Sequence, residues 1–248
     1  MATLTEFTQA FNTKKVIFMY GKLIISSLAL LIASQSAFAA GSGGIVLGAT
    51  RVVYDANNKE ASLTINNKNS DQYFLVQSWI DDENGNKKVP FAITPPLFRL
   101  DAEKENMMRI LKTAGDLPSD RESVFYINVK AIPPVPENTN AQNTLQLAIK
   151  TRIKMFYRPK GLTGNPAESG KQLQWSHQGN DLVVKNPTNY SVSFNEINLS
   201  GKALKDINMV LPKSETHYAW PAGAGNNVTF AFINDYGGVS ELISATAN

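Results

Sequence analysis

Residues 144–158 read Thr-Leu-Gln-Leu-Ala-Ile-Lys-Thr-Arg-Ile-Lys-Met-Phe-Tyr-Arg, and this stretch indicates the fold most clearly in a chain of 248 residues. Leu145, Leu147 and Ile149 alternate with polar or small residues. Because successive side chains of a strand point to opposite faces, the stretch predicts a β-strand longer than the usual five or six residues. Its apolar face can pack on the core of its own domain, or part of it can stay open and be offered to a partner as an added strand. The pattern alone leaves both interpretations open.

Six shorter segments of alternating or β-branched residues precede this strand. Clusters of Asn, Asp, Gly and Pro, the usual turn residues, separate them. No segment after the first forty residues has the sustained apolar period of a helix. Seven short strands in succession predict a β-sandwich of the immunoglobulin type. The six earlier strands are expected at residues 45–54, 61–66, 73–80, 91–94, 106–111 and 124–131.

The strand pattern breaks after Arg158, where a stretch rich in Pro and Gly predicts a linker at residues 159–166. We therefore expect one all-β domain at residues 40–158 and a second β-sandwich at residues 167–248. The second domain is expected to have strands at residues 173–176, 181–185, 191–199, 207–211, 216–220, 227–233 and 239–243.

The first residues have the pattern of a secretory signal peptide. Lys14 and Lys15 precede an apolar run at residues 16–33, which Lys22 interrupts, and Ala37-Phe38-Ala39 offers a cleavage site. The alternative is a retained membrane anchor, but the main apolar run at residues 23–33 is short for a membrane span. We expect cleavage of residues 1–39, with Met19 as an alternative start, and export of the remaining chain.

The composition excludes several classes of function. Apolar residues make up 43% and charged residues 18%, as in globular proteins. Residues 1–39 hold three lysines and one glutamate, so their removal lowers the net charge from +3 to +1, which argues against nucleic-acid binding. The chain has no cysteine and only His177 and His217, so we expect no metal site, no cofactor and no catalytic activity.

Several segments together resemble the periplasmic chaperones of the chaperone–usher pilus pathway, which include those of P and type 1 pili. They are spread over the chain in the order in which the family has them. The resemblance implies two immunoglobulin-like domains in an L- or boomerang-shaped arrangement. It also implies a periplasmic protein that binds, folds and caps pilus subunits without ATP and delivers them to an outer-membrane usher. The matching segments are residues 48–54, 94–100, 105–111, 120–133, 145–159 and 233–237.

The same resemblance implies roles for individual residues. Arg51 and Lys154 match a basic pair that holds the C-terminal carboxylate of the subunit. Leu145, Leu147 and Ile149 match the residues that fill the groove left by a strand that the subunit lacks. Lys154 has the opposite parity in the strand, so either a bulge or a change of neighbouring strand is needed to reconcile the two sets.

Glu122, Arg158 and Asp235 match an ion network between the two domains, which would fix their orientation. The short connection at residues 134–143 resembles that of chaperones serving rod-like pili. Self-association of the free protein is possible in this family, but no residue predicts it here. The alternative function is a secreted structural fimbrial subunit or adhesin, which the absence of a cysteine pair disfavours.

Overall fold

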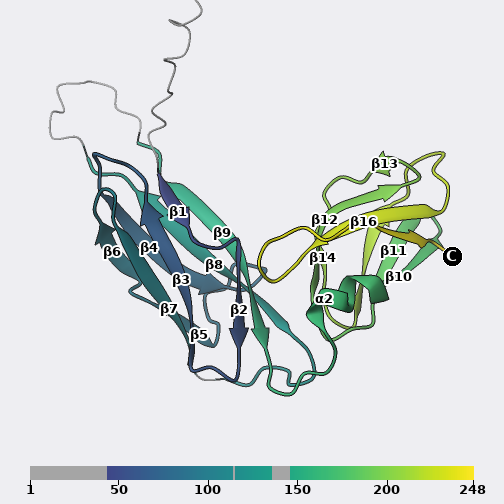
Figure 1. Ribbon diagram of the computed structural model, residues 1–248, viewed down its shortest axis with the longest axis horizontal. Helices are drawn as coiled ribbons and strands as arrows, with labels where there is room; N and C mark the ends of the chain where they lie inside the picture. Colours follow the sequence, from purple (N-terminus) through teal and green to yellow (C-terminus); the bar gives the residue numbers. More distant parts are fainter. Residues whose placement is uncertain (1–43, 114, 136–145) are drawn as a thin grey trace, which may run out of the picture. The chain divides into compact units, whose positions relative to one another are not determined.

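The computed structural model describes residues 44–113, 115–135 and 146–248 (Figure 1). The expected cleavage site at Ala39, and Leu145, lie outside these residues. Within the described ranges, no helix is both long and apolar enough to cross a membrane. The structure is almost entirely β, as the sequence predicts, and it contains two sandwiches with separate hydrophobic cores.

The first sandwich packs two sheets against each other. One has the strand order β1-β3-β7-β5 and the other the order β2-β9-β8-β4-β6. The chain passes from the first sheet to the second between β1 and β2, so that the expected single strand at 45–54 is divided in two. The strands are β1 (Ile45–Leu47), β2 (Arg51–Asp55), β3 (Glu60–Asn67), β4 (Phe74–Asp81), β5 (Phe91–Thr94), β6 (Leu97–Leu100), β7 (Glu105–Lys112), β8 (Ser123–Ile132) and β9 (Ile149–Arg158).

The second sandwich is smaller. One of its sheets has the order β10-β11-β15, and the other has the order β13-β12-β16-β17 with β14 also paired to β12. Its strands are β10 (Gln174–Gln178), β11 (Asp181–Asn186), β12 (Val192–Leu199), β13 (Lys202–Ala203), β14 (Met209–Val210), β15 (Ser214–Ala219), β16 (Asn227–Ile233) and β17 (Ile243–Thr246).

Alternation along the strands builds both cores. In β7, Met108 and Ile110 are fully buried, while the intervening Arg109 is exposed. Phe230 at the centre of β16 is 1% exposed and packs against Trp175, with 5.0 Å between the ring centroids. Burying one large apolar side chain away from water contributes about 1.5–3 kcal/mol to the free energy of unfolding. Each sandwich is therefore held by its own buried apolar set.

The structure differs from the expected secondary structure in several details. A short helix that was not expected, α2 (Pro166–Ser169), begins at the last residue of the expected linker and is followed by the 3-10 turn η1 (Gly170–Gln172). The side chain of Asn165 caps α2 by accepting a hydrogen bond from the Ala167 N–H, and Pro166 occupies its first turn, so residues read as linker form a helix start. The strand expected at 239–243 instead lies at Ile243–Thr246, and the strands β6 and β13 were not expected.

The long strand begins later than the sequence pattern suggested. β9 starts at Ile149, paired with Ala131 near the end of β8, and the described residues 146–148 just before it belong to no strand. From Ile149 to Tyr157 the register with β8 is unbroken, which excludes a bulge. The other neighbour changes instead: β2 pairs with β9 in parallel only from Lys154 onward. Lys154 and Ile149 therefore lie on opposite faces of β9, and the feature that changes between them is the second neighbouring strand.

Candidate functional site

Arg51 and Lys154 lie directly opposite each other where β2 first pairs with β9. The two residues come from segments far apart in the sequence, and only the parallel pairing of the strands brings them together. Like charges at directly opposed strand positions repel each other. This pairing therefore carries an electrostatic cost that the folded chain must offset elsewhere.

The Arg51 side chain is buried against the second sandwich. The residue is 9% exposed, and its Nη1 donates a hydrogen bond of 3.0 Å to the carbonyl oxygen of Ile233, at the end of β16. Its Nε is buried and has no hydrogen-bond partner among the described residues. Burial lowers the pKa of Arg51, and the charge of Asp235 offsets this in part. Much of the hydrogen-bonding capacity of this guanidinium is unused.

Lys154 also reaches the second sandwich. Its Nζ donates a hydrogen bond of 3.3 Å to the hydroxyl oxygen of Ser193 in β12. Burial, and then the neighbouring charge of Arg51, lower the pKa of Lys154. Ser193 and the carbonyl of Ile233 were not expected from the sequence, because a hydroxyl and a backbone oxygen carry no pattern that marks them as partners.

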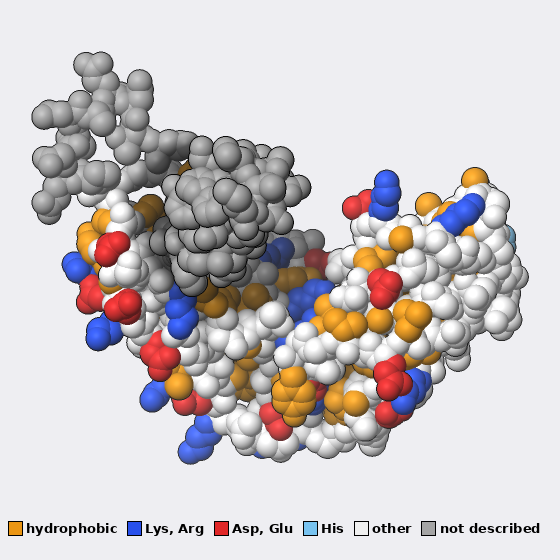
Figure 2. Space-filling view, turned by 45° about the horizontal axis from the view of Figure 1, so that its top comes forward, with side chains coloured by type: hydrophobic (Ala, Val, Ile, Leu, Met, Phe, Trp, Pro, Cys, Tyr) orange, Lys and Arg blue, Asp and Glu red, His pale blue; other side chains and the backbone are white. Residues whose placement is uncertain are grey.

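Neither cation has a carboxylate within ion-pair distance in the part of the chain that the structure describes. Acidic and basic side chains are interspersed over the visible face of the molecule, so surface charge alone does not mark this site (Figure 2). A bound anion would favour the charged forms of both side chains and reverse the cost of their burial. The pair has the charge and the donors to hold a carboxylate, with a planar fork from Arg51 and a compact charge from Lys154.

An open strand edge leads away from this pair. Upstream of Lys154, β9 is paired with β8 on one side and, among the described strands, has no partner on the other. Leu147 and Ile149 are each 69% exposed. Ile153 and Met155, which share the parity of Ile149, are 9% and 0% exposed and belong to the core. The same face of the chain therefore changes from buried to open on going upstream from Ile153.

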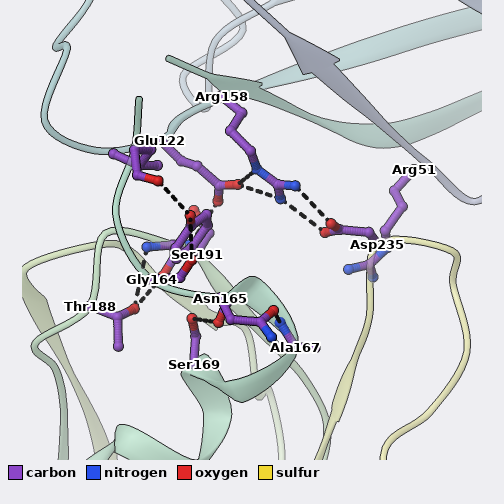
Figure 3. A network of polar contacts seen from close by, with 12 residues as sticks. Arg51, Glu122, Arg158, Gly164, Asn165, Ala167, Ser169, Thr188, Ser191 and Asp235 are labelled. Carbon is purple, nitrogen blue, oxygen red and sulfur yellow. Dashed lines mark hydrogen bonds and ion pairs between the residues drawn. The ribbon is translucent and has the colours of Figure 1, made fainter. Parts of the chain in front are cut away.

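The three residues of the expected ion network do meet (Figure 3). Arg158, at the end of β9, donates from Nε and Nη2 to Oε1 of Glu122, at 2.9 and 2.7 Å. It also donates from Nη1 and Nη2 to the two carboxylate oxygens of Asp235, at 2.9 and 3.1 Å. The second oxygen of Glu122 accepts a hydrogen bond of 2.8 Å from the backbone N–H of Ser191. The network therefore joins the first sandwich to residues of the second.

Electrostatics within this network favour the charged guanidinium. Burial lowers the pKa of Arg158, but the hydrogen bonds and charges of Asp235 and Glu122 outweigh it and raise the pKa overall. Burial raises the pKa of Glu122, which is 4% exposed, and Arg158 and the Ser191 N–H oppose this shift. Each carboxylate oxygen of Glu122 nevertheless has a donor, as a buried charge requires.

Two further contacts between the sandwiches have no counterpart in the sequence expectations. Tyr126, Phe156 and Met209 form a small buried cluster, with Met209 contributed by β14. Lys213 donates a hydrogen bond of 2.7 Å to Asp120 on the surface. Phe156 has the parity of Lys154, so alternation past Ile153 could have indicated that this face meets another surface.

The two histidines lie on the second sandwich. His177 stacks on Trp220 with 3.6 Å between the ring centroids, and His217 lies 3.4 Å from Asp181 and 3.5 Å from Glu215. Across the described ranges, no group of three or more His, Asp or Glu side chains could hold a metal ion.

Comparison with protein families gives two matches that together cover most of the described chain. Residues 44–163 match the family described as pili and flagellar-assembly chaperone, PapD N-terminal domain. Residues 168–244 match the pili assembly chaperone PapD, C-terminal domain.

Curated relatives and solved structures give the same family. The chaperone protein LpfB of Salmonella typhimurium is 46% identical over 91% of this chain and 98% of its own length. The chaperone protein FimC of Escherichia coli K12 is 39% identical, with 88% of each chain covered. The structure of the Salmonella enterica SafA pilin in complex with the SafB chaperone matches with a TM-score of 0.77 and 32% identity, over 82% of this chain and 96% of that chain. The E. coli chaperone DraB matches with a TM-score of 0.74 and 36% identity, over 83% and 97%.

These matches confirm the family and the fold class expected from the sequence. The family is one of assembly proteins and not of enzymes. From its domains, its relatives and the arrangement of its strands, the chain belongs to the periplasmic pilus-assembly chaperones.

Proposed function

We propose that this chaperone captures a pilus subunit by holding its terminal carboxylate between Arg51 and Lys154 and by adding the open edge of β9 to it as a strand. The observation that supports this most is the adjacency of the buried Arg51 and the half-buried Lys154 at the point where the open edge begins, with no carboxylate of the described residues at ion-pair distance from either. The similar chaperone SafB was solved in complex with the SafA pilin, which supports a pilus subunit as the partner of this chain.

The two parts of the site supply different kinds of interaction. Charge-assisted hydrogen bonds to a carboxylate are about twice as strong as neutral ones. They also fix one end of the incoming chain. An added strand gains backbone hydrogen bonds along its length, while alternate side chains enter pockets of the partner. Leu147 and Ile149 are the exposed apolar side chains available for such pockets, and Leu145 would extend the series.

The need for such a chaperone follows from the incomplete fold that the family implies for its subunits. A sandwich without its last strand exposes its core and unpaired strand edges, and both promote aggregation. A strand supplied by the chaperone covers the exposed core and edges until the subunit reaches the outer-membrane usher. This role requires binding and release only, so we propose no catalytic activity for the chain.

We further propose that the network of Glu122, Arg158 and Asp235 holds the two sandwiches in the geometry that the site needs. Arg51 and Lys154 each use a partner from the second sandwich, Ile233 and Ser193. A change in the contact between the sandwiches would therefore move both cations relative to their partners. Such a network contributes specific geometry more than net stability.

The test is co-purification from periplasm with a pilus subunit, for the wild type and the variants Arg51→Ala and Lys154→Ala. We expect each substitution to weaken the complex by about 2–5 kcal/mol, because a buried carboxylate loses its partner. Arg99→Ala and Lys171→Ala serve as matched controls, since both side chains are 59% exposed, and they should bind as the wild type does. Complexes that survive both substitutions in folded protein would reject the carboxylate site.

A further inference from the structure

The loop between β16 and β17 is held in one conformation beside Arg51. The Asn234 side-chain oxygen accepts hydrogen bonds from the N–H groups of Tyr236 and Gly238, at 3.0 and 2.9 Å. The backbone closes the same turn, with Asn234 N–H donating to the Gly238 carbonyl at 2.9 Å. Asp235 is in turn held by Arg158 through both carboxylate oxygens. These contacts fix the backbone on either side of Tyr236.

The loop also contacts the first sandwich at a defined place. Gly237 has φ of +85°, and a Cβ there would collide with the hydroxyl of Thr50. Only glycine combines this backbone conformation with so close an approach. Thr50 directly precedes Arg51, so the contact lies at the end of β2 where the open edge of β9 begins.

Tyr236 extends from this fixed loop into solvent. Its side chain is 98% exposed, the most exposed of the large hydrophobic residues in the described ranges. Two hollows adjoin it, of about 280 and 600 Å³, and Arg51 and Asp235 line both of them. An aromatic ring presented on a rigid backbone loses little conformational freedom on binding and offers a large contact area.

We propose that Tyr236 is a binding residue for the last side chains of the subunit, and that its ring packs against the residue next to the terminal carboxylate. This inference rests on the proposed function, since it places the subunit terminus at Arg51. With this residue, the site would recognise the shape of the last side chains of the subunit in addition to the charge of its terminal carboxylate. The ring would favour subunits that end in apolar or aromatic residues over those that end in charged or very small ones.

The experiment measures binding of a synthetic peptide that ends in the natural C-terminus of a co-purifying subunit, in free-acid and amide forms. We expect Tyr236→Ala to weaken binding of both forms about tenfold, as is common for central aromatic contacts, and Tyr236→Phe to change it less than about twofold. Arg51→Ala should weaken the acid form far more than the amide form. Leu242→Ala, at a side chain that is 59% exposed on the second sandwich, is the control for loss of an exposed apolar group.

Each outcome separates the two proposals. If Tyr236→Ala binds both peptides as the wild type does while Arg51→Ala loses the acid form, the role of Tyr236 is rejected and the carboxylate site stands. If the acid and amide forms bind the wild type equally, the carboxylate site itself is rejected. Thermal unfolding of Tyr236→Ala should match the wild type, because so exposed a side chain adds little to stability. A tenfold loss for Tyr236→Phe as well would show that the hydroxyl, and not the ring, makes the contact.

Discussion

The two ends of the ladder between β2 and β9 each carry an arginine, buried at Arg51 and half-buried at Arg158, and the partners of the two differ. At one end Arg51 opposes Lys154 and has no carboxylate partner among the described residues, while at the other end Arg158 opposes Asp55 and is held by Glu122 and Asp235. A cation that is satisfied within the chain fixes local geometry, and its removal is costly because the buried carboxylate is left unpaired. A cation that is buried and left without a counter-ion costs stability and is poised to bind an anion from a partner.

The directions of the pKa shifts follow this division. The pKa of Arg158 is raised overall because its two carboxylates outweigh the burial of the guanidinium. The pKa values of Arg51 and Lys154 are both lowered, in each case chiefly by burial. The comparison therefore makes opposite predictions for the two ends of the same pair of strands.

The largest expected effect is at the satisfied end. Arg158→Ala should lower the free energy of unfolding by about 3 kcal/mol, because it leaves the buried Glu122 without its counter-ion. Urea unfolding measures this, with Arg99→Ala as the control. Arg99 pairs with Asp101 at the surface, where both side chains are about 60% exposed, and such pairs contribute at most about 1 kcal/mol. Equal losses of unfolding free energy in the two variants would show that the buried network matters no more to stability than a surface ion pair.

The open edge should affect binding without affecting the fold. Ile149→Asp should weaken subunit binding by about 2 kcal/mol, roughly the value of burying one isoleucine, while the unfolding free energy stays unchanged. The reason is that Ile149 is 69% exposed in the free chain. Leu242→Asp, on the second sandwich, controls for the introduced charge. A destabilised Ile149→Asp protein with normal subunit binding would contradict the assignment of this edge.

At the unsatisfied end, removal of a charge should stabilise the chain. Lys154→Met should raise the free energy of unfolding by about 1 kcal/mol, because an apolar side chain of similar length avoids the cost of burying an unpaired cation. The same variant should lose subunit binding. Lys150→Met is the control, since Lys150 is exposed on the same strand and should stay within about 0.5 kcal/mol. A clear loss of stability in Lys154→Met would show that Lys154 supports the fold.

The smallest effect is a dependence of binding on pH. In the free chain the pKa of Lys154 lies below its usual 10.5, and a bound carboxylate should raise it. Binding therefore takes up protons wherever the free lysine is partly neutral, and affinity should fall as the pH rises through the alkaline range below 10.5, by roughly threefold. Calorimetric titration of the subunit peptide at increasing pH measures this.

Lys154→Arg provides the matching control, because an arginine keeps its charge throughout that range. Its affinity should stay constant as the pH rises. If Lys154→Arg shows the same decline as the wild type, another group is responsible for the dependence.

Sequence reasoning located most strands because alternation is a local property. The strand at 227–233 was predicted with the bounds that the structure has, Asn227–Ile233. It was wrong where the pairing of strands sets the bounds. β9 starts at Ile149, and residues 146–148 are outside any strand, because a strand needs a neighbour and β8 ends at Ile132. Helix α2 was missed because its four residues are too few to show a helical period, although Asn165 and Pro166 are typical of a helix start.

The sequence by itself determined that the chain is all-β, that it has two sandwiches and, through the resemblance of several motifs, the family and the candidate residues. Alternation and turn residues act over a few positions, so they can be read from the order of amino acids. The tertiary structure alone decided that Arg51 opposes Lys154, that their partners are Ser193 and the carbonyl of Ile233, and that Tyr236 extends from a fixed loop beside them. These contacts join residues up to 182 positions apart, and whether a charge is satisfied or left open depends on burial and on neighbours that no local pattern encodes.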